Sequence, residues 1–137
     1  MFFLWGHYLE GIARRDTMIE PPQFYEFEKM PFEKLNEKIF RRYVYGKNAM
    51  LVYFDLRKGA IIPEHHHVSE QITYIIKGKV RVFSAGKEFI VGKGEVLLIP
   101  PHTPHRFEAL EDTFDIDVFS PLRQDWLEGT DSYLKGN

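Results

Sequence analysis

Short runs of β-branched and aromatic residues constrain the fold of this chain more than any other feature. They follow one another from residue 39 onward, and glycine, proline or asparagine separates them every several residues. The runs read IFRRYVYG, NAMLVYFDLRKG, QITYIIKG, KVRVFSAG, KEFIVGKG, EVLLIPP and TFDIDVFSP. This spacing is typical of an all-β sandwich or barrel. Residues 84–87 and 92–94 have the composition of hairpin turns.

A chain of 137 residues favours one domain, and the remaining segments are expected to frame its β-rich part. We expect an extension over residues 1–38, which is irregular or packed on the barrel, because prolines and mixed charge precede the first run. The barrel is expected over residues 39–121. In residues 122–137, Leu122 and Trp126 have helical spacing, which predicts a short C-terminal helix lying on the barrel.

Charge and cysteine content exclude several classes of function. The net charge of -2 argues against a nucleic-acid surface, and the pairs Arg14–Arg15 and Arg41–Arg42 are expected on solvated surface. The absence of cysteine excludes disulfides and thiolate metal sites, and it fits the cytoplasmic location that we expect. The apolar segment Phe2–Trp5 is too short to cross a membrane and lacks the features of a signal peptide. Met18 is an alternative start to Met1.

Three consecutive histidines, His65–His67, interrupt the apolar sequence. Side chains alternate along a strand, so the outer two histidines would point toward one side and the middle one away. Gln71 begins the next run and could reach the same point if the two strands pair. His102 or His105 would supply a third imidazole. The alternative to a metal site is a solvated turn.

The spacing around these histidines resembles the two motifs of the cupin superfamily. The first motif corresponds to residues 59–78 and the second to residues 94–105. Gln71 stands where many cupins have glutamate, and His102 replaces the usual glycine. The resemblance implies an all-β cupin double-stranded β-helix, or jelly-roll barrel. It also implies the metal ligands His65, His67, Gln71 and His105.

Gln71 has a direct chemical consequence for such a site. Three neutral imidazoles and a neutral amide leave the full dipositive charge on a metal, whereas glutamate would cancel part of it. The site is therefore expected to be a strong Lewis acid. Non-haem iron oxygenases commonly use two histidines and a carboxylate, so oxygen chemistry is less favoured. The ligand set suits a divalent Zn, Ni, Mn or Fe ion.

The last run places acidic residues within an apolar strand. Alternation puts Asp115, Asp117 and Phe119 on one face. This face is either the wet side of an edge strand or the inside of the barrel, where burial and a metal would tune the pKa of a carboxylate. Arg123 follows the strand and could clamp a substrate carboxylate through two parallel hydrogen bonds.

A narrower resemblance combines HHHVSEQITYIIKG, IPPHTPH and DVFSPLRQDWL. Together they resemble small single-domain cupins of the pectin-degradation type, the KdgF family, which converts 4,5-unsaturated uronate monosaccharides to linear ketouronates. The family's functional aspartate, phenylalanine and arginine correspond to Asp117, Phe119 and Arg123. This implies catalysis by Asp117 and Arg123 and substrate binding by Phe119 and Arg123. We add His102 to the substrate-binding candidates, at the mouth of the pocket.

The resulting hypothesis is a metal-dependent uronate isomerase or lyase-type enzyme acting on a small anionic sugar. The alternatives are a sensory cupin that binds a small molecule without turnover and, less favoured by Gln71, an iron or copper dioxygenase. No nucleic-acid or membrane partner is expected. We expect a homodimer, because strands such as Leu97–Ile99 are apolar on both faces and an aromatic-rich segment precedes residue 45.

Overall fold

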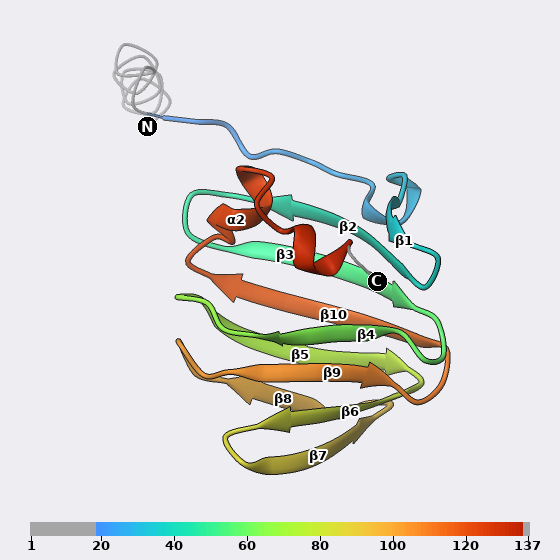
Figure 1. The fold of residues 1–137 in the computed structure, drawn as a ribbon. Helices are drawn as coiled ribbons and strands as arrows, with labels where there is room; N and C mark the ends of the chain where they lie inside the picture. The colour runs from blue at the N-terminus through green and yellow to red at the C-terminus, as the bar shows by residue number, and fades with distance from the viewer. Residues whose placement is uncertain (1–18, 136–137) are drawn as a thin grey trace, which may run out of the picture.

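The computed structural model of the chain describes residues 19–135, which form two antiparallel β-sheets (Figure 1). The strands of the larger sheet are β1 (Glu33–Asn36), β2 (Ile39–Tyr45), β3 (Met50–Leu56), β5 (Glu70–Lys77), β8 (Val96–Ile99) and β10 (Thr113–Ser120). The strands of the smaller sheet are β4 (Ile61–His65), β6 (Lys79–Ser84), β7 (Lys87–Gly92) and β9 (His105–Ala109). The short helices are η2 (Phe27–Lys29), α2 (Gln124–Leu127) and η3 (Ser132–Leu134).

The order of the strands confirms the predicted all-β barrel. The larger sheet runs β1-β2-β3-β10-β5-β8, and the smaller sheet runs β4-β9-β6-β7. Buried apolar side chains from both sheets form one core, so the sheets pack face to face. Between Ile19 and Lys135, no helix is long and apolar enough to span a membrane.

Alternating side chains explain why these sequences form a layered structure. In β3, every second residue from Met50 to Leu56 is buried, and the intervening residues are partly exposed. β10 repeats this pattern between β3 and β5, its neighbours on either side. The buried face of β10 includes Asp115, Asp117 and Phe119. The acidic residues therefore lie inside the barrel and not on a wet edge.

Glycine and a positive backbone angle shape the turn between β6 and β7. Ala85 has a φ of 52° and Gly86 a φ of 73°, and the flanking Ser84 and Lys87 pair across the hairpin. Two successive residues with positive φ characterise the type I′ turn, whose twist matches that of the strands. The hairpin predicted at residues 84–87 is confirmed. The one predicted at residues 92–94 is wrong, because this turn joins β7 to β8, which belong to different sheets.

The segment before residue 39 contributes to the sheet. We expected an irregular or packed extension up to residue 38, but β1 pairs with β2 from Glu33 onward. Phe27 and Phe32 pack on Tyr53, and the Arg42 guanidinium lies over these rings. The residues from Glu33 therefore belong to the larger sheet. Phe2–Trp5, Arg14–Arg15 and Met18 lie outside the described residues.

Arg41 corrects one prediction. We expected the Arg41–Arg42 pair on solvated surface, but Arg41 is buried and forms an ion pair of 2.6 Å with buried Asp131. Its guanidinium also lies 4.2 Å from the ring centre of Trp126 in α2. Burial of a guanidinium requires such partners, because an unpaired charge in the interior is costly. The ion pair joins the C-terminal segment to β2.

The predicted C-terminal helix is present but short. α2 spans four residues, and its Trp126 packs against Phe54 and Phe119. The chain then turns back, and η3 places Leu134 in the core. Figure 1 shows α2 and η3 close to β2 and β3. The C-terminal segment therefore packs along β2 and β3, with η3 next to β4.

The outer face of the larger sheet carries exposed apolar residues. Val96 and Leu98 of β8 are 58% and 55% exposed, and the neighbouring Ile72 and Tyr74 of β5 are also exposed. The inner face of β8 packs in the barrel, as its buried Ile99 shows. Within residues 19–135, no second layer covers the outer face of these two strands. The homodimer stays a prediction.

Candidate metal centre

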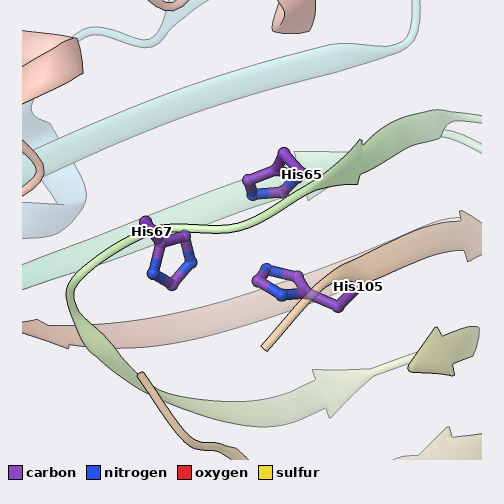
Figure 2. Close-up of side chains that lie close together, drawn as sticks. All are labelled: His65, His67 and His105. Carbon is purple, nitrogen blue, oxygen red and sulfur yellow. The ribbon is translucent and has the colours of Figure 1, made fainter. Parts of the chain in front are cut away.

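The three histidines predicted as ligands lie together at one end of the barrel. His65 ends β4, His105 begins β9, and the two residues face each other across the strand pair. His67 lies in the loop that follows β4. One nitrogen from each ring lies within 4.8 Å of the other two, and Figure 2 shows the rings gathered around a common space. The rings of His65 and His105 have centroids 4.4 Å apart.

The way the histidines converge differs from the expected way. We placed His65 and His67 on one strand, with Gln71 on a strand that pairs with it. Instead β4 ends at His65, and β4 and β5 belong to different sheets. The loop between β4 and β5 crosses from one sheet to the other, and it carries His67 between His65 and Gln71. The residues therefore converge across the barrel and not along a strand.

All three imidazoles are oriented by the same kind of hydrogen bond. Each Nδ1 bonds a backbone carbonyl two residues away. The pairs are His65 with Pro63 (2.9 Å), His67 with Ser69 (2.8 Å) and His105 with Thr103 (2.7 Å). A carbonyl only accepts hydrogen bonds, so Nδ1 carries the proton and Nε2 presents a lone pair. Metal-binding histidines are commonly oriented this way.

Gln71 extends the centre through a chain of hydrogen bonds. Its amide nitrogen donates to the Thr73 hydroxyl at 2.9 Å, and that hydroxyl donates to Asp117 at 2.7 Å. Thr73 has one hydroxyl proton, which the carboxylate takes, so Thr73 must accept from the amide NH₂. The amide oxygen of Gln71 therefore faces Nε2 of His67, 3.0 Å away.

The two atoms at this contact are both acceptors. Nε2 of His67 has no proton if Nδ1 donates to Ser69, and an amide oxygen has none. Two lone pairs at this distance require a cation or a proton between them. Nε2 of His105 is also buried, with no hydrogen-bond partner within the described residues. These observations fit a metal ion held by His65, His67, Gln71 and His105.

Burial keeps the imidazoles neutral. Burial, followed by the charge of the neighbouring His105, lowers the pKa of His65 to about 3. Burial, followed by the positive charge of Arg123, lowers the pKa of His67 to about 4. The pKa of His105 is also lowered, mainly by burial. Neutral imidazole is the form that binds metals, so the site is ready for a metal at neutral pH.

A buried pair of carboxyl groups lies next to this centre. Burial raises the pKa of Asp115 well above its ordinary value, and the negative charge of Asp117 raises it further. Burial also raises the pKa of Asp117, while hydrogen bonds from Asp115 and Thr73 oppose the rise. Of the two, Asp115 therefore keeps its proton more readily, and Asp117 ionises more readily.

A cavity of about 20 Å³ joins the histidines to the acidic pair. Its walls come from both sheets and from the C-terminal segment. They include the predicted site residues His65, Gln71, His105, Asp117, Phe119 and Arg123, together with Asp115, Trp126, Tyr133 and Leu134. A larger hollow of about 820 Å³ lies between residues 20–25 and the β2–β3 hairpin, and none of the predicted site residues line it.

Arg123 enters the cavity with two partners that the sequence did not indicate. Its Nε and Nη2 donate to Asp125 at 3.0 and 2.8 Å, and Nη2 also donates to the Tyr133 hydroxyl. Burial raises the pKa of Asp125, but the hydrogen bonds and charge of Arg123 outweigh it, and the net pKa is lowered. The guanidinium lies 5.0 Å from the ring centre of Phe119. The charge of Arg123 is therefore largely balanced by Asp125.

Comparison with known proteins identifies the family. Residues 52–120 match the sequence profile of the cupin domain. The chain is also 31% identical over 103 residues to the pectin degradation protein KdgF of Dickeya dadantii (strain 3937), an alignment that covers 73% of this chain and 94% of that protein. The chain is a cupin of the KdgF family.

Solved structures support this assignment. KdgF from a Halomonas species aligns with a TM-score of 0.71 at 29% identity, covering 76% of this cupin and 99% of that chain. An RmlC-like cupin from Shewanella frigidimarina NCIMB 400 aligns with a TM-score of 0.72 at 26% identity, covering 80% of this cupin and 99% of that chain. Both alignments span most of the described barrel.

The remaining polar candidates of this KdgF-family cupin lie outside the cavity. The side chains of His66, Glu70 and His102 are exposed. His102 has a φ of 62°, and its backbone nitrogen donates to the His67 carbonyl at 2.8 Å. This bond ties the loop before β9 to the loop that carries His67. A contact between the His102 side chain and a substrate stays a prediction.

Proposed function

We propose that this cupin is a metal-dependent enzyme that converts 4,5-unsaturated uronate monosaccharides to linear ketouronates. The observation that carries the proposal is a single cavity lined by three groups with complementary chemistry. These are the neutral imidazoles, the Asp117 carboxylate and the Arg123 guanidinium. The relationship to a pectin degradation protein supports an acidic sugar as the substrate.

The proposed reaction conserves every atom of the substrate. The anomeric hydroxyl gives up a proton, the bond between the anomeric carbon and the ring oxygen breaks, and an aldehyde and an enolate form. The enolate then becomes a ketone when a proton is added to the neighbouring carbon. The enzyme must therefore remove one proton, deliver one proton and hold the carboxylate, and it needs no oxidant.

Asp117 is the residue proposed to move these protons. Its carboxyl group lies inside the cavity beside that of Asp115, and it accepts a hydrogen bond from the Thr73 hydroxyl at 2.7 Å. A carboxylate whose pKa is raised by burial is a stronger base than an exposed one, which suits the removal of a hydroxyl proton. The Asp115–Asp117 pair can retain the proton until the enolate accepts it at carbon.

Arg123 and Phe119 are proposed to bind and shield the sugar. Arg123 would orient the carboxylate through guanidinium protons that face the cavity. Phe119 packs against both Arg123 and His67, with ring centroids 5.5 Å apart in the second pair, so it forms an apolar wall between the two groups. Such a wall excludes water and strengthens the electrostatic contacts within the cavity.

His65, His67, Gln71 and His105 would hold the metal. A divalent ion held there would supply Lewis acidity toward substrate oxygens, because four neutral ligands would leave its charge uncancelled. Its identity among Zn, Ni, Mn and Fe is open to elemental analysis.

Turnover of unsaturated galacturonate tests the proposal. Purified protein of measured metal content is mixed with the sugar, and the absorbance of its conjugated double bond is followed. Loss of absorbance that stops when the metal is removed is the expected result. An absence of turnover on any unsaturated uronate would reject the enzyme and favour the sensory alternative. Oxygen consumption during the reaction would favour the dioxygenase alternative.

A further inference from the structure

The cavity at the metal centre is too small for a sugar. Its volume is about 20 Å³, which corresponds to roughly one or two water molecules. Pockets that hold small molecules have volumes of roughly 300–1,000 Å³. A monosaccharide therefore fits in this cavity only if part of the cavity wall moves.

Part of the cavity wall comes from residues 129–135, which we name the C-terminal gate. Tyr133 and Leu134 of the gate line the cavity. The Tyr133 ring lies against His65, with centroids 4.9 Å apart and planes inclined by 34°. The gate thus occupies the space directly beside one of the three imidazoles.

Tyr133 also occupies the position that a substrate carboxylate needs. Nη2 of Arg123 donates to the Tyr133 oxygen, and the Tyr133 hydroxyl donates to Asp125 at 3.3 Å. The phenol oxygen therefore accepts a guanidinium proton on the cavity side, as a carboxylate oxygen would. A sugar carboxylate and the Tyr133 hydroxyl compete for this proton.

The gate and the helix before it are anchored separately. α2 is fixed by Trp126, which is buried among aromatic rings. The gate is held by the Asp131–Arg41 ion pair, by the Leu134 side chain and by a bond of 3.2 Å from Asn36 to the Leu134 carbonyl. Gly129, with a φ of 74°, joins the two parts and permits a change of backbone direction that other residues resist.

We propose that the C-terminal gate opens at Gly129 to admit the ligand, and that Tyr133 holds the place of the ligand's carboxylate on Arg123. The proposal rests on the proposed function only for the nature of the ligand, an anionic sugar. Tyr133 thereby becomes a specificity-determining residue. A uronate replaces the hydrogen bond between Tyr133 and Arg123 with an ionic contact between its own carboxylate and Arg123. A neutral sugar cannot make this ionic contact.

The first experiment measures binding of galacturonate, a saturated uronate, by calorimetry. Tyr133→Phe removes the hydroxyl but keeps the ring, so closing the gate no longer gains a bond to Arg123. We expect affinity to rise about 10-fold, because apparent affinity scales with the fraction of open molecules. Tyr74→Phe, at an exposed position on β5, is the matched control and should leave affinity unchanged. Equal or weaker binding by Tyr133→Phe overturns the place-holding role.

The second experiment tests the gate without any sugar. Metal-free protein is treated with diethyl pyrocarbonate, and acylation of each histidine is followed by mass spectrometry. Exposed His66 and His102 serve as internal controls. Asp131→Asn and, separately, Leu134→Ala should raise the acylation rate of His65 several-fold with the controls unchanged. An unchanged His65 rate in both folded variants overturns the gate.

The two experiments separate the two proposals. Turnover of the unsaturated uronate by the parent, combined with an unchanged His65 rate in both folded gate variants, rejects the gate and keeps the enzyme. If the parent has no turnover but the gate variants expose His65, the gate is supported and the proposed enzymatic function is rejected. The acylation result decides the gate in either case.

Discussion

Thr73→Val tests whether the centre depends on the direction of one amide. The Thr73 hydroxyl is fully buried between Gln71 and Asp117, at 2.9 and 2.7 Å. Valine has nearly the same shape but neither donates nor accepts a hydrogen bond. The amide nitrogen of Gln71 then has no hydrogen-bond partner at position 73. The amide is free to rotate, so its oxygen is no longer held toward the metal centre.

The size of the effect follows from the two bonds that are lost. A bond to a charged group contributes about 1.5–3 kcal/mol and a neutral one about 1 kcal/mol, so the free energy of unfolding should fall by roughly 2–4 kcal/mol. Loss of a group that orients a metal ligand typically weakens metal binding about 10–100-fold. This corresponds to about 1.4–2.8 kcal/mol of binding free energy, since each tenfold is worth about 1.4 kcal/mol.

Competition with a chromophoric chelator measures the metal affinity of each variant. Thr73→Ser keeps the hydroxyl and should bind metal nearly as the parent does. Thr113→Val is the matched control, because Thr113 is equally buried but its hydroxyl bonds the backbone of Lys79 and Glu111. It should destabilise the fold without changing metal affinity. Metal affinity of Thr73→Val within twofold of the parent would refute the reasoning.

Four further predictions address the ligands, the chemistry and the assembly. Gln71→Glu should retain metal, measured by elemental analysis, but turn over uronate more slowly, because a negative ligand lowers Lewis acidity; faster turnover contradicts this. Asp117→Asn should lower kcat by about 100-fold or more at unchanged metal content, whereas Arg123→Ala should mainly raise KM; a near-parental kcat would remove Asp117 from the mechanism. Metal affinity should stay nearly flat from pH 7 to pH 5, because the pKa values of His65 and His67 are about 3 and 4 and protons compete only below them; a tenfold loss per pH unit in this range contradicts it. Light scattering should report a dimer at micromolar concentration, and a monomer would reject that prediction.

Local periodicity was sufficient to predict most of the fold and part of the site. Alternation along residues 113–120 correctly placed Asp117 and Phe119 on a common face, and the structure shows that this face is interior. The same rule, applied from Gln71 to Thr73, would have indicated the orienting hydroxyl, since both residues face inward. The prediction stopped at Gln71 because an isolated threonine in a strand is ordinarily a packing residue.

Other parts of the site depend on contacts that no local pattern encodes. Tyr133 reaches Arg123 only because the chain reverses after α2, and the Arg41–Asp131 pair that holds this reversal spans 90 positions of sequence. His67 was assigned to a strand because a repeat of alternate histidines resembles one, yet β4 ends before it. β1 was missed because its sequence, EKLN, lacks the β-branched residues that favour strands.

The position of β10 has a consequence for how the protein is made. β10 is the last strand to leave the ribosome, yet it lies in the middle of the larger sheet and joins β3 to β5. Until Ser120 has emerged, the nascent chain holds two separate sheet fragments with open edges, which are the edges most prone to wrong pairing. His65, His67, Gln71 and His105 are all synthesised before β10, whereas Asp117 arrives with it. A nascent chain can therefore meet a metal ion before the carboxylate that the proposed reaction uses is in place, and loading of the metal can precede closure of the barrel.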